Sequence, residues 1–332
     1  MMNTIQTDQD IVEDIELVSG KLRQVKEATA AVIFGQDRVI DLALTTLLSG
    51  GHCLLIGVPG LAKTSLVETF GTVLGLDNKR IQFTPDLMPS DIVGSEVLEE
   101  NELGKRDFRF IKGPVFTQLL MADEINRASP KTQSALLQAM QEYHVTFAGA
   151  RHDIPTPFHV LATQNPLEQE GTYPLPEAQL DRFIMQIDVD YPDEASERKM
   201  LYATTGTDQR SLRAVFSPNE LLISQKLVRQ IPIGEQVVDT ILKLVRSARP
   251  GGGATEEMEK RIAWGPGPRA SQSFMLAVRA RALLDNRLAP SIDDVIELAE
   301  PILKHRMALT FAARAEGWHI NDVIKKLCLQ FV

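Results

Sequence analysis

The sequence predicts an α/β protein, with a parallel αβα core followed by a small all-helical domain. Two observations carry this prediction. Before residue 192, four to five short apolar runs alternate with helical patterns, which is typical of a parallel sheet covered by helices. After Pro192-Asp193 the apolar residues recur at helical spacing instead. We therefore predict a core domain over residues 1–192 and a linker with a helical domain over 193–332.

The N-terminal third is predicted to run from helices into the sheet. Apolar residues from Ile11 to Val32 recur at helical spacing, and a second helix is expected over 37–48. Cys53-Leu54-Leu55-Ile56 is apolar throughout and indicates a buried strand. A helix over 64–75 and a strand over 80–84 follow.

The middle of the chain combines further buried strands with two hairpins and one helix. Ser129-Pro130 is a favourable N-cap and first helical residue for that helix. The hairpins are expected over 96–111, with a turn over 101–104, and over 145–154. Buried strands are predicted over 115–124, 158–163 and 183–189, and C-terminal helices near 237–245, 270–285 and 293–304.

A small-residue loop between the first strand and a helix is the most informative motif, from Gly57 to Thr64. A helix N-terminus presents unpaired N–H groups, and small residues let the backbone approach phosphate oxygens closely. We expect Lys63 to reach the β- and γ-phosphates of ATP and Thr64 to hold Mg²⁺. Ala62 replaces the usual glycine and tolerates a left-handed conformation less easily. The alternative is a fortuitous Gly-Pro-Gly turn before a helix.

Two carboxylates at the end of the strand over 115–124 supply the second motif. In a parallel sheet, chemistry lies at the carboxyl ends of the strands. We expect Asp123 to bind Mg²⁺ and Glu124 to orient and polarise the attacking water. A solvated Asp-Glu turn is the alternative, which the apolar run before the pair and the upstream loop disfavour.

Four further residues are candidates for the chemistry around the γ-phosphate. Asn165 follows a predicted strand and is able to position water, unless it only forms an Asn-Pro turn. Arg182 is a candidate arginine finger, a residue type worth about 10³–10⁵ in rate, or else a surface partner of Asp181. Arg269, at a predicted helix start, either touches the γ-phosphate or is a solvated helix-end charge. Arg127 is a second finger candidate.

Composition narrows the class of protein. The net charge is −9, from 35 basic and 44 acidic residues, which argues against bulk nucleic-acid binding. Cys53 and Cys328 are the only cysteines, so the sequence has neither a disulfide framework nor zinc-ligand spacing. No apolar run reaches about 18 residues, and the polar, acidic N-terminus is unlike a signal peptide. We expect no membrane span and a cytoplasmic location.

With these residues laid out, the chain resembles the MoxR family of AAA+ ATPases over nearly its whole length, from Phe34-Gly35-Gln36 to His305-Arg306. Alanine before the P-loop lysine is usual in that family, so Ala62 supports the resemblance. Pro268 stands where the family often has another small residue. The segments that carry the resemblance are GVPGLAKT (57–64), ADEINRA (122–128), ATQNP (162–166), PEAQLDRF (176–183) and GPRA (267–270).

The resemblance implies an AAA+ core with a helical lid domain, and ATP and Mg²⁺ as cofactors. Lys63 and Thr64 would form Walker A, and Asp123 and Glu124 would form Walker B. Thr64 and Asp123 would be the residues that bind Mg²⁺. Gly35 and Gln36 would lie beside the adenine. The nucleotide contacts implied in the loop and after it are Gly57, Pro59, Gly60, Leu61, Ala62, Lys63, Thr64 and Ser65.

The resemblance also implies sensors and an assembly. Asn165 would be sensor 1, Arg182 the arginine finger and Arg269 sensor 2. The two hairpins match insertions that face the central pore of ring ATPases. Members of the family form hexameric rings and act like chaperones, often with a partner that carries a von Willebrand factor A domain. That partner would be a separate protein here.

Three functions stay open from the sequence. The first is a ring ATPase that remodels a protein partner, which the acidic balance and the resemblance favour. The second is a nucleic-acid motor or a regulator of a DNA-bound complex, since related helicases share the hairpins. The third is a switch that binds ATP but barely hydrolyses it, which Glu124 disfavours because such a switch needs no complete Walker B pair.

Overall fold

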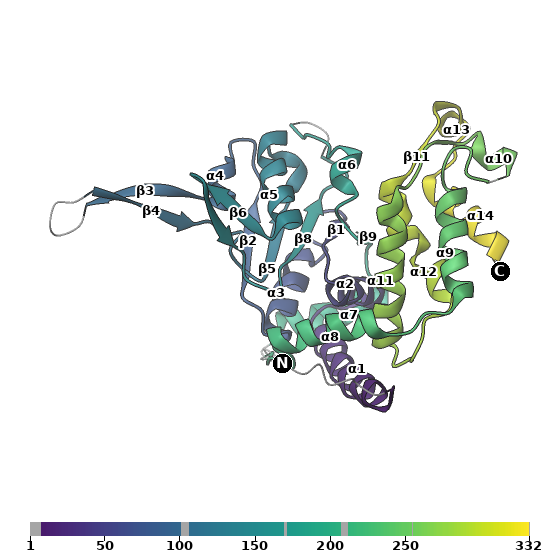
Figure 1. The fold of residues 1–332 in the computed structure, drawn as a ribbon, viewed down its shortest axis with the longest axis horizontal. Coiled ribbons are helices and arrows are strands. Elements are labelled where there is room, and N and C mark those ends of the chain that lie inside the picture. The colour runs from purple at the N-terminus through teal and green to yellow at the C-terminus, as the bar shows by residue number, and fades with distance from the viewer. Residues whose placement is uncertain (1–7, 101–105, 169–170, 207–211, 254, 332) are drawn as a thin grey trace.

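The computed structural model describes residues 8–331, apart from 101–105, 169–170, 207–211 and 254. Its centre is a parallel five-stranded sheet in the order β2-β5-β8-β1-β9 (Figure 1). This arrangement confirms the predicted α/β class, a parallel core followed by a helical region. The strands are β1 (Cys53–Ile56), β2 (Asn78–Gln82), β5 (Leu119–Asp123), β8 (His159–Gln164) and β9 (Met185–Asp188).

Alternate residues of the strands enter two different apolar layers. Cys53 and Leu55 of β1 pack with one group of helices, whereas Leu54 between them packs on the opposite face. The layer that contains Cys53 joins the sheet to α1 (Asp8–Ala30), α2 (Asp37–Leu48) and α3 (Lys63–Val73). The layer that contains Leu54 joins it to α5 (Pro130–Glu142). Burial on both faces explains the nearly continuous apolar runs of β1, β5 and β8.

Two hairpins leave the core where the sequence predicts them. One comprises β3 (Gly94–Glu100) and β4 (Arg106–Lys112), and it projects far from the body of the molecule (Figure 1). The other comprises β6 (His144–Phe147) and β7 (Ala150–Asp153). Phe110 of β4 stacks on His152 of β7 with ring centroids 4.1 Å apart, so the two hairpins touch. The turn predicted over 101–104 lies outside the described residues.

Besides shifts of one or two residues at element ends, the core differs from the predictions in one strand start and one short helix. The strand before Asp123 begins at Leu119, because 115–118 form a turn in which Thr117 donates a hydrogen bond to the Asp77 carbonyl at 2.8 Å. A short helix, α4 (Pro89–Val93), lies in a segment for which the sequence predicts little helical character. Its N-terminus is fixed by the Asp91 carboxylate, which accepts from the Met88 N–H at 2.8 Å.

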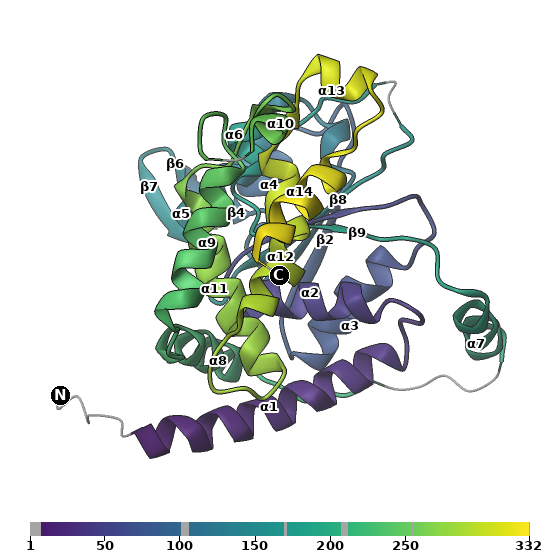
Figure 2. The same cartoon turned by 90° about the vertical axis from the view of Figure 1, so that its right-hand side faces the viewer.

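The C-terminal region is mainly helical. Helix α7 (Glu194–Thr205) has no buried residue and lies apart from the helices of residues 235–328, which we call the lid helices (Figure 2). A small antiparallel ladder of β10 (Ile262–Trp264) and β11 (Ala308–Leu309) adds to the predicted helices. None of the described helices is both long and apolar enough to cross a membrane. The helices here are α7 (Glu194–Thr205), α8 (Pro218–Gln230), α9 (Glu235–Ser247), α10 (Glu256–Glu259), α11 (Pro268–Leu284), α12 (Ile292–Leu303), α13 (Phe311–Ala315) and α14 (Ile320–Cys328).

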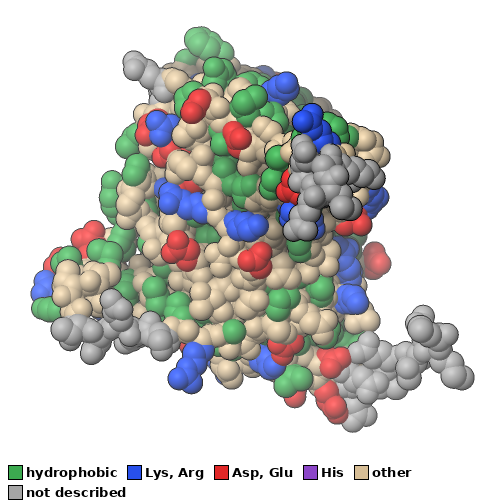
Figure 3. Space-filling model, turned by 90° about the vertical axis from the view of Figure 1, so that its left-hand side faces the viewer, with side chains coloured by type: hydrophobic (Ala, Val, Ile, Leu, Met, Phe, Trp, Pro, Cys, Tyr) green, Lys and Arg blue, Asp and Glu red, His purple; other side chains and the backbone are tan. Residues whose placement is uncertain are grey.

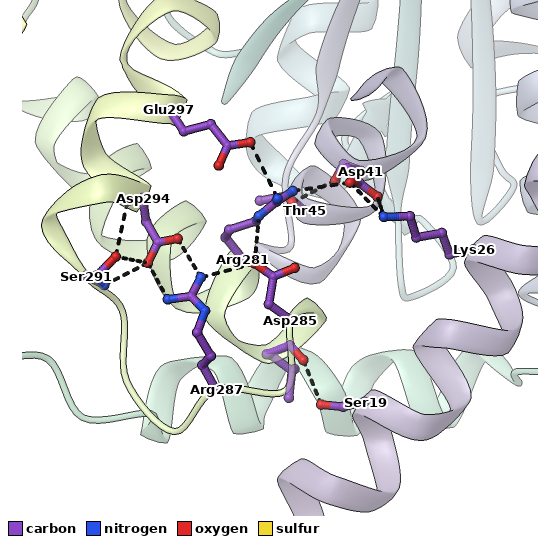
Figure 4. Close-up of polar contacts among 11 residues, drawn as sticks. Ser19, Lys26, Asp41, Thr45, Arg281, Asp285, Arg287, Ser291, Asp294 and Glu297 are labelled. Atoms are coloured by element: carbon purple, nitrogen blue, oxygen red, sulfur yellow. Dashed lines mark hydrogen bonds and ion pairs between the residues drawn. The ribbon is translucent and has the colours of Figure 1, made fainter. Parts of the chain in front are cut away.

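A network of ion pairs fastens the lid helices to the N-terminal helices (Figure 4). Arg281 of α11 lies 3.4 Å from the Asp41 carboxylate of α2, which also pairs with Lys26 of α1 at 2.7 Å. The Ser19 hydroxyl of α1 donates to the Leu283 carbonyl of α11 at 2.6 Å. These contacts join helices α1 and α2, near the N-terminus, to helix α11 of the C-terminal region.

Candidate active site

A cavity of about 590 Å³ opens at the carboxyl ends of the central strands. We call it the P-loop cavity. One wall is the loop after β1 together with the start of α3, and the other is formed by the ends of β2, β5 and β8. It is lined by Pro59, Gly60, Leu61, Ala62, Lys63, Thr64, Ser65, Arg80, Gln82, Asp123, Glu124, Arg127, Thr163, Gln164 and Asn165. The structure therefore brings the predicted Walker residues and Asn165 into one site.

The loop after β1 has the backbone shape needed to surround an anion. Gly60 has φ +86° and Ala62 has φ +54°, so both lie in the left-handed region. For a residue with a Cβ atom this conformation costs about 1–2 kcal/mol, a strain that the usual glycine avoids. A Cβ on Gly57 would lie 2.6 Å from the Val189 carbonyl oxygen, so only glycine fits there. The α3 helix begins at Lys63, directly after this bend.

Lys63 is held against its own loop. Its Nζ donates to the carbonyl oxygens of Gly57 and Val58, each at 2.7 Å. Burial lowers the pKa of Lys63, while the nearby Asp123 and Glu124 carboxylates act in the opposite direction. These contacts keep the ammonium at the mouth of the loop, where a phosphate is able to exchange for the two carbonyl oxygens.

Asp123 is compensated by one cation and one hydroxyl group. Arg80 of β2 donates to its Oδ2 from Nη2 at 2.5 Å and from Nε at 3.2 Å. The Thr163 hydroxyl donates to Oδ1 at 2.5 Å. The Asp123 side chain is thereby fixed with its negative charge at the cavity wall, close to the loop.

Glu124 is held by two neighbouring side chains of the cavity wall. Its Oε2 accepts from Gln82 Nε2 and from Arg127 Nη1, each at 2.8 Å. Its backbone N–H donates to Thr163 Oγ1 at 2.9 Å, and its φ is +54°. A glutamate in the left-handed region is strained, and such strain is concentrated at functional sites. The hydrogen bond that Arg127 donates to Glu124 raises the pKa of Arg127, which keeps that guanidinium charged.

Three contacts of this site were missed by the sequence analysis. Arg80 and Gln82 lie two residues apart on β2 and therefore share a face, the one that meets the carboxylates. Register places Gln82 opposite Asp123. Thr163 belongs to β8, next to β5 in the sheet. The available signal was the polar alternation in β2, which is equally typical of an exposed edge strand.

Of the remaining predicted nucleotide residues, Asn165 lines the P-loop cavity and Gly35 and Gln36 do not. Asn165 is buried, and its Oδ1 accepts from the Leu167 N–H at 3.1 Å. Gln36 donates to the Asp190 carbonyl at 2.7 Å, just after β9. A Cβ on Gly35 would meet Ser196 of α7 at 2.7 Å, so the first turn of α7 covers this glycine. Gly35 and Gln36 do not line the P-loop cavity, and their place beside an adenine stays a prediction.

Arg182 and Arg269 lie in a second cavity, of about 250 Å³, which we call the arginine cavity. Its wall also includes Gly51, His52, Met140, Gln141, Tyr143, Asp181, Ile184, Gln272, Ser273 and Leu276. Arg269, at the start of α11, does not reach the P-loop cavity of its own chain. Arg127 does the reverse, because it lines the P-loop cavity and pairs with Glu124. The two arginine-finger candidates, Arg127 and Arg182, therefore lie in different cavities.

The arginine cavity holds two neighbouring cations. Burial lowers the pKa of Arg182 and the charge of Arg269 lowers it further, whereas the Glu142 carboxylate acts in the opposite direction. Arg182 forms no ion pair with any residue that the structure describes, and its Nε is buried without a hydrogen-bond partner there. Arg269 Nη1 lies 3.8 Å from the Asp181 carboxylate. This cavity is therefore short of negative charge.

The P-loop cavity fits a magnesium nucleoside triphosphate. The N-terminus of α3 and Lys63 suit the phosphates, and Thr64 supplies a hydroxyl of the kind that binds Mg²⁺. Asp123 supplies a carboxylate on the opposite wall, and Glu124 lies beside it. A parallel αβα sheet with this loop, this carboxylate pair and a helical lid defines a P-loop ATPase.

Comparison with known proteins places the chain within that class. Residues 52–185 match the model of the ATPase family associated with various cellular activities (AAA), and residues 255–327 match the AAA lid domain. Chaperone MoxR1 of Mycobacterium tuberculosis is 43% identical over 89% of this chain and 78% of its own length. Protein MoxR of Paracoccus denitrificans is 30% identical over 87% of this chain and 89% of its own length.

A solved structure agrees in three dimensions. A protein of Cytophaga hutchinsonii, described as a candidate ATPase, superimposes with a TM-score of 0.88 and 39% identity, over 96% of both chains. The chain belongs to the AAA ATPase family and is an ATPase of the MoxR type.

Proposed function

We propose that this protein hydrolyses ATP with Mg²⁺ at sites shared between neighbouring copies of the chain in a hexameric ring. The carrying observation is the arginine cavity, where Arg182 and Arg269 lie together without enough negative charge. A triphosphate in the P-loop cavity of another copy has the missing charge. Arg182 is partly buried and Arg269 is exposed, so both are open to an anion of another copy, and this charge complementarity favours assembly around the nucleotide.

Each half of such a site has a separate task. MgATP supplies the phosphoanhydride bond that breaks and the charge of the metal ion. Lys63 would bind the phosphates and Thr64 would bind Mg²⁺. Asp123 would be the second residue to hold Mg²⁺, once Arg80 releases its carboxylate. Glu124 would accept the proton of the attacking water, oriented by Gln82 and Arg127.

Neighbouring residues complete the charge stabilisation. Asn165 would orient the attacking water from the rim of the P-loop cavity. Arg182 and Arg269 of the adjacent copy would stabilise the charge that develops on the transferred phosphoryl group. Preorganised cations of this kind act without reorganising during the reaction, and they commonly supply a large part of the rate enhancement.

We further propose that the ring acts as a chaperone-like remodelling factor for a protein complex, in the cytoplasm, with a separate partner that carries a von Willebrand factor A domain. The relative named chaperone MoxR1 supports a chaperone role. The projecting β3–β4 hairpin exposes Val97, Leu98 and Ile111, apolar side chains suited to a protein client. On the face from which this hairpin projects, acidic and basic side chains are intermixed (Figure 3).

A trapping experiment tests this role. Tagged Glu124→Gln protein, incubated with ATP, would be isolated from its native cell extract, with Lys63→Ala as the matched control that cannot bind nucleotide. Native mass spectrometry would measure the assembly, and proteomics would identify what it holds. We expect a six-copy complex and a protein enriched only in the Glu124→Gln sample, carrying a von Willebrand factor A domain.

Two results would contradict the proposal. Nuclease-sensitive nucleic acid in the Glu124→Gln sample, without a protein partner, would support a nucleic-acid motor instead. A Glu124→Gln protein that stays monomeric with saturating ATP would contradict the shared site.

A further inference from the structure

The most deeply buried charged side chain of the described structure belongs to Arg306, which is 1% exposed. It lies in the 3₁₀ turn η2 (Lys304–Arg306) that follows α12 of the lid, and it reaches into the core. Its Nε donates to Asp181 Oδ1 at 2.7 Å. A buried guanidinium is costly unless its charge is paired and its N–H groups are hydrogen-bonded. Arg306 satisfies both conditions, so its position is strongly determined.

The core partners of Arg306 surround Arg182 in the sequence. Its Nη2 donates to the carbonyl oxygens of Asp181 at 3.3 Å and Phe183 at 2.6 Å, and its Nη1 donates to that of Ile184 at 3.0 Å. The segment 181–184 therefore has its backbone fixed on both sides of Arg182. We call these contacts of Arg306 with the backbone of residues 181–184, together with its pair with Asp181, the Arg306 clamp. Because the backbone position determines where a side chain begins, the clamp fixes the Cα position of Arg182.

Other contacts tie the same guanidinium to the lid. Arg306 Nη1 donates to the Ile302 carbonyl of α12 at 2.6 Å, and its Nη2 donates to Ser273 Oγ of α11 at 3.2 Å. Ser273 lies one helical turn after Arg269 on α11. His305 Nε2 adds a hydrogen bond to the Phe183 carbonyl at 3.1 Å. A movement of α11 and α12 is thus passed to the segment that carries Arg182.

Asp181 is the link between the two arginines of the cavity. One carboxylate oxygen pairs with Arg306, and the other lies 3.8 Å from Arg269 Nη1. The clamp therefore touches Arg182 through the backbone and Arg269 through a shared carboxylate.

We propose that Arg306 and Asp181 are positioning residues, which set the geometry of Arg182 and Arg269 for the nucleotide of a neighbouring copy and couple that geometry to the lid. This inference rests on the proposed shared site. The clamp contacts no residue of its own chain's P-loop cavity among those described. Loss of the clamp should therefore damage what a copy gives to its neighbour and spare the site that the copy itself contains.

Mixing variants separates these two effects. Lys63→Ala copies lack a working P-loop cavity but offer intact arginines, whereas Arg182→Ala copies do the opposite. Asp181→Asn keeps the shape of the side chain and removes its charge, and Arg306→Lys is the second test variant. The matched control is Asp41→Asn, which removes the charge from a different ion pair between the lid and the core, that of Arg281 with Asp41 (Figure 4). ATP turnover and binding of a fluorescent ATP analogue would be measured for each protein alone and for equimolar mixtures.

We expect Asp181→Asn alone to lose at least about tenfold in kcat, because a hydrogen bond between charged groups is lost, with analogue binding retained. Turnover should recover on mixing with Lys63→Ala, whose copies supply intact arginines, and not on mixing with Arg182→Ala. Recovery with Lys63→Ala also proves that the variant folds and assembles. Asp41→Asn should remain active alone.

Recovery with Arg182→Ala, or full activity of both Asp181→Asn and Arg306→Lys alone, would overturn the positioning role while leaving the shared site intact. Failure of Asp181→Asn to recover with Lys63→Ala would overturn it as well. A mixture of Arg182→Ala and Lys63→Ala without any recovered turnover would overturn the shared site itself, and this inference with it.

Discussion

The P-loop cavity and the arginine cavity differ in how their charges are compensated. In the P-loop cavity, Asp123 pairs with Arg80, and Glu124 pairs with Arg127. In the arginine cavity, Arg182 and Arg269 line the same wall, and Arg182 has no ion pair among the described residues. Both carboxylates of the first cavity have an arginine partner, and Lys63 there is hydrogen-bonded to two carbonyl oxygens. In the second cavity the Arg182 Nε has no hydrogen-bond partner among the described residues.

This difference indicates that the arginine cavity, rather than the P-loop cavity, depends on an anion held by another copy of the chain. A paired cavity persists in the isolated chain, and its ion pairs are exchanged when nucleotide enters. Two neighbouring cations repel each other, and an anion that binds between them removes this repulsion. We infer that nucleotide binding begins in the P-loop cavity and that the arginine cavity of an adjacent copy then closes on it. The predictions below test this division from the largest expected effect to the smallest.

Arg182→Ala should cause the largest loss. An arginine finger contributes about 10³–10⁵ in rate, so we expect turnover to fall by about 10³-fold or more, while ATP affinity of the single chain changes little. Steady-state kinetics and equilibrium binding measure the two quantities. Arg127→Ala is the informative comparison, since Arg127 lies in the P-loop cavity. Turnover of Arg182→Ala within a few-fold of the unaltered protein would assign the finger elsewhere.

Glu124→Gln should separate binding from hydrolysis within the P-loop cavity. The amide cannot accept the proton of the attacking water, and general-base catalysis is typically worth about 10²–10⁴-fold. We expect turnover to fall by about 10²-fold or more with ATP still bound, measured by phosphate release and by nucleotide retention. Equal turnover in the two proteins would show that Glu124 is not the base and would favour an ATP-binding switch.

The two cavities should also differ in their response to acid. His52 lines the arginine cavity, and burial lowers its pKa to about 3, helped by neighbouring His159, whose own burial lowers its pKa to about 4. The unfolded chain takes up these protons near pH 6.5, whereas the folded chain does not. Their contribution is therefore fully present above about pH 6.5 and falls with decreasing pH by about 1.4 kcal/mol per unit for each histidine.

Denaturant unfolding at pH 7 and pH 5 measures this slope. His52→Gln keeps a donor for the Met140 carbonyl, which His52 Nε2 contacts at 3.2 Å, and removes one titrating group. We expect a smaller loss of stability between the two pH values than in the unaltered protein. His144→Gln, at a hairpin outside this pair, is the control. An unchanged slope in His52→Gln would refute the assignment.

Ala62→Gly should have the smallest effect. Ala62 has φ +54°, and glycine removes a strain of about 1 kcal/mol. We expect a stability gain of up to about 1 kcal/mol, with ATP affinity within about threefold. Ala148→Gly is the matched control, since Ala148 has φ +47° in the turn between β6 and β7. A large loss of ATP affinity in Ala62→Gly alone would show that the methyl group is required at the phosphates.

The P-loop half of the site was largely predictable from the sequence. Its residues lie in two short segments, each attached to a buried strand, and the order of such strands places their carboxyl ends together. Lys63, Asp123 and Glu124 therefore meet as the motifs predict. Arg80 and Gln82 were missed because period-two polarity in β2 is equally typical of an exposed edge strand.

The arginine half depends on tertiary packing, which local patterns do not encode. Arg269 was a candidate for contact with a γ-phosphate, without an assignment to its own or an adjacent copy, and the packing of α11 places it in the cavity with Arg182. The burial of Arg306 was equally unpredictable from the sequence, because an arginine after a helix is usually solvated. Its environment arises from carbonyls more than 100 residues away in the chain. Long-range contacts of this kind also create the β10–β11 ladder within a region predicted to be helical.

Whether the two cavities meet between copies is most directly tested by crosslinking. Ser65→Cys places a thiol in the P-loop cavity, and Gln272→Cys places one in the arginine cavity. The native thiols do not interfere, because burial raises the pKa of Cys53 to about 12 and that of Cys328 to about 11. With ATP and a short thiol-reactive crosslinker, we predict covalent dimers in a mixture of the two variants and none in either variant alone. A mixture that yields no dimers, although both thiols react with a small maleimide, would contradict the shared site.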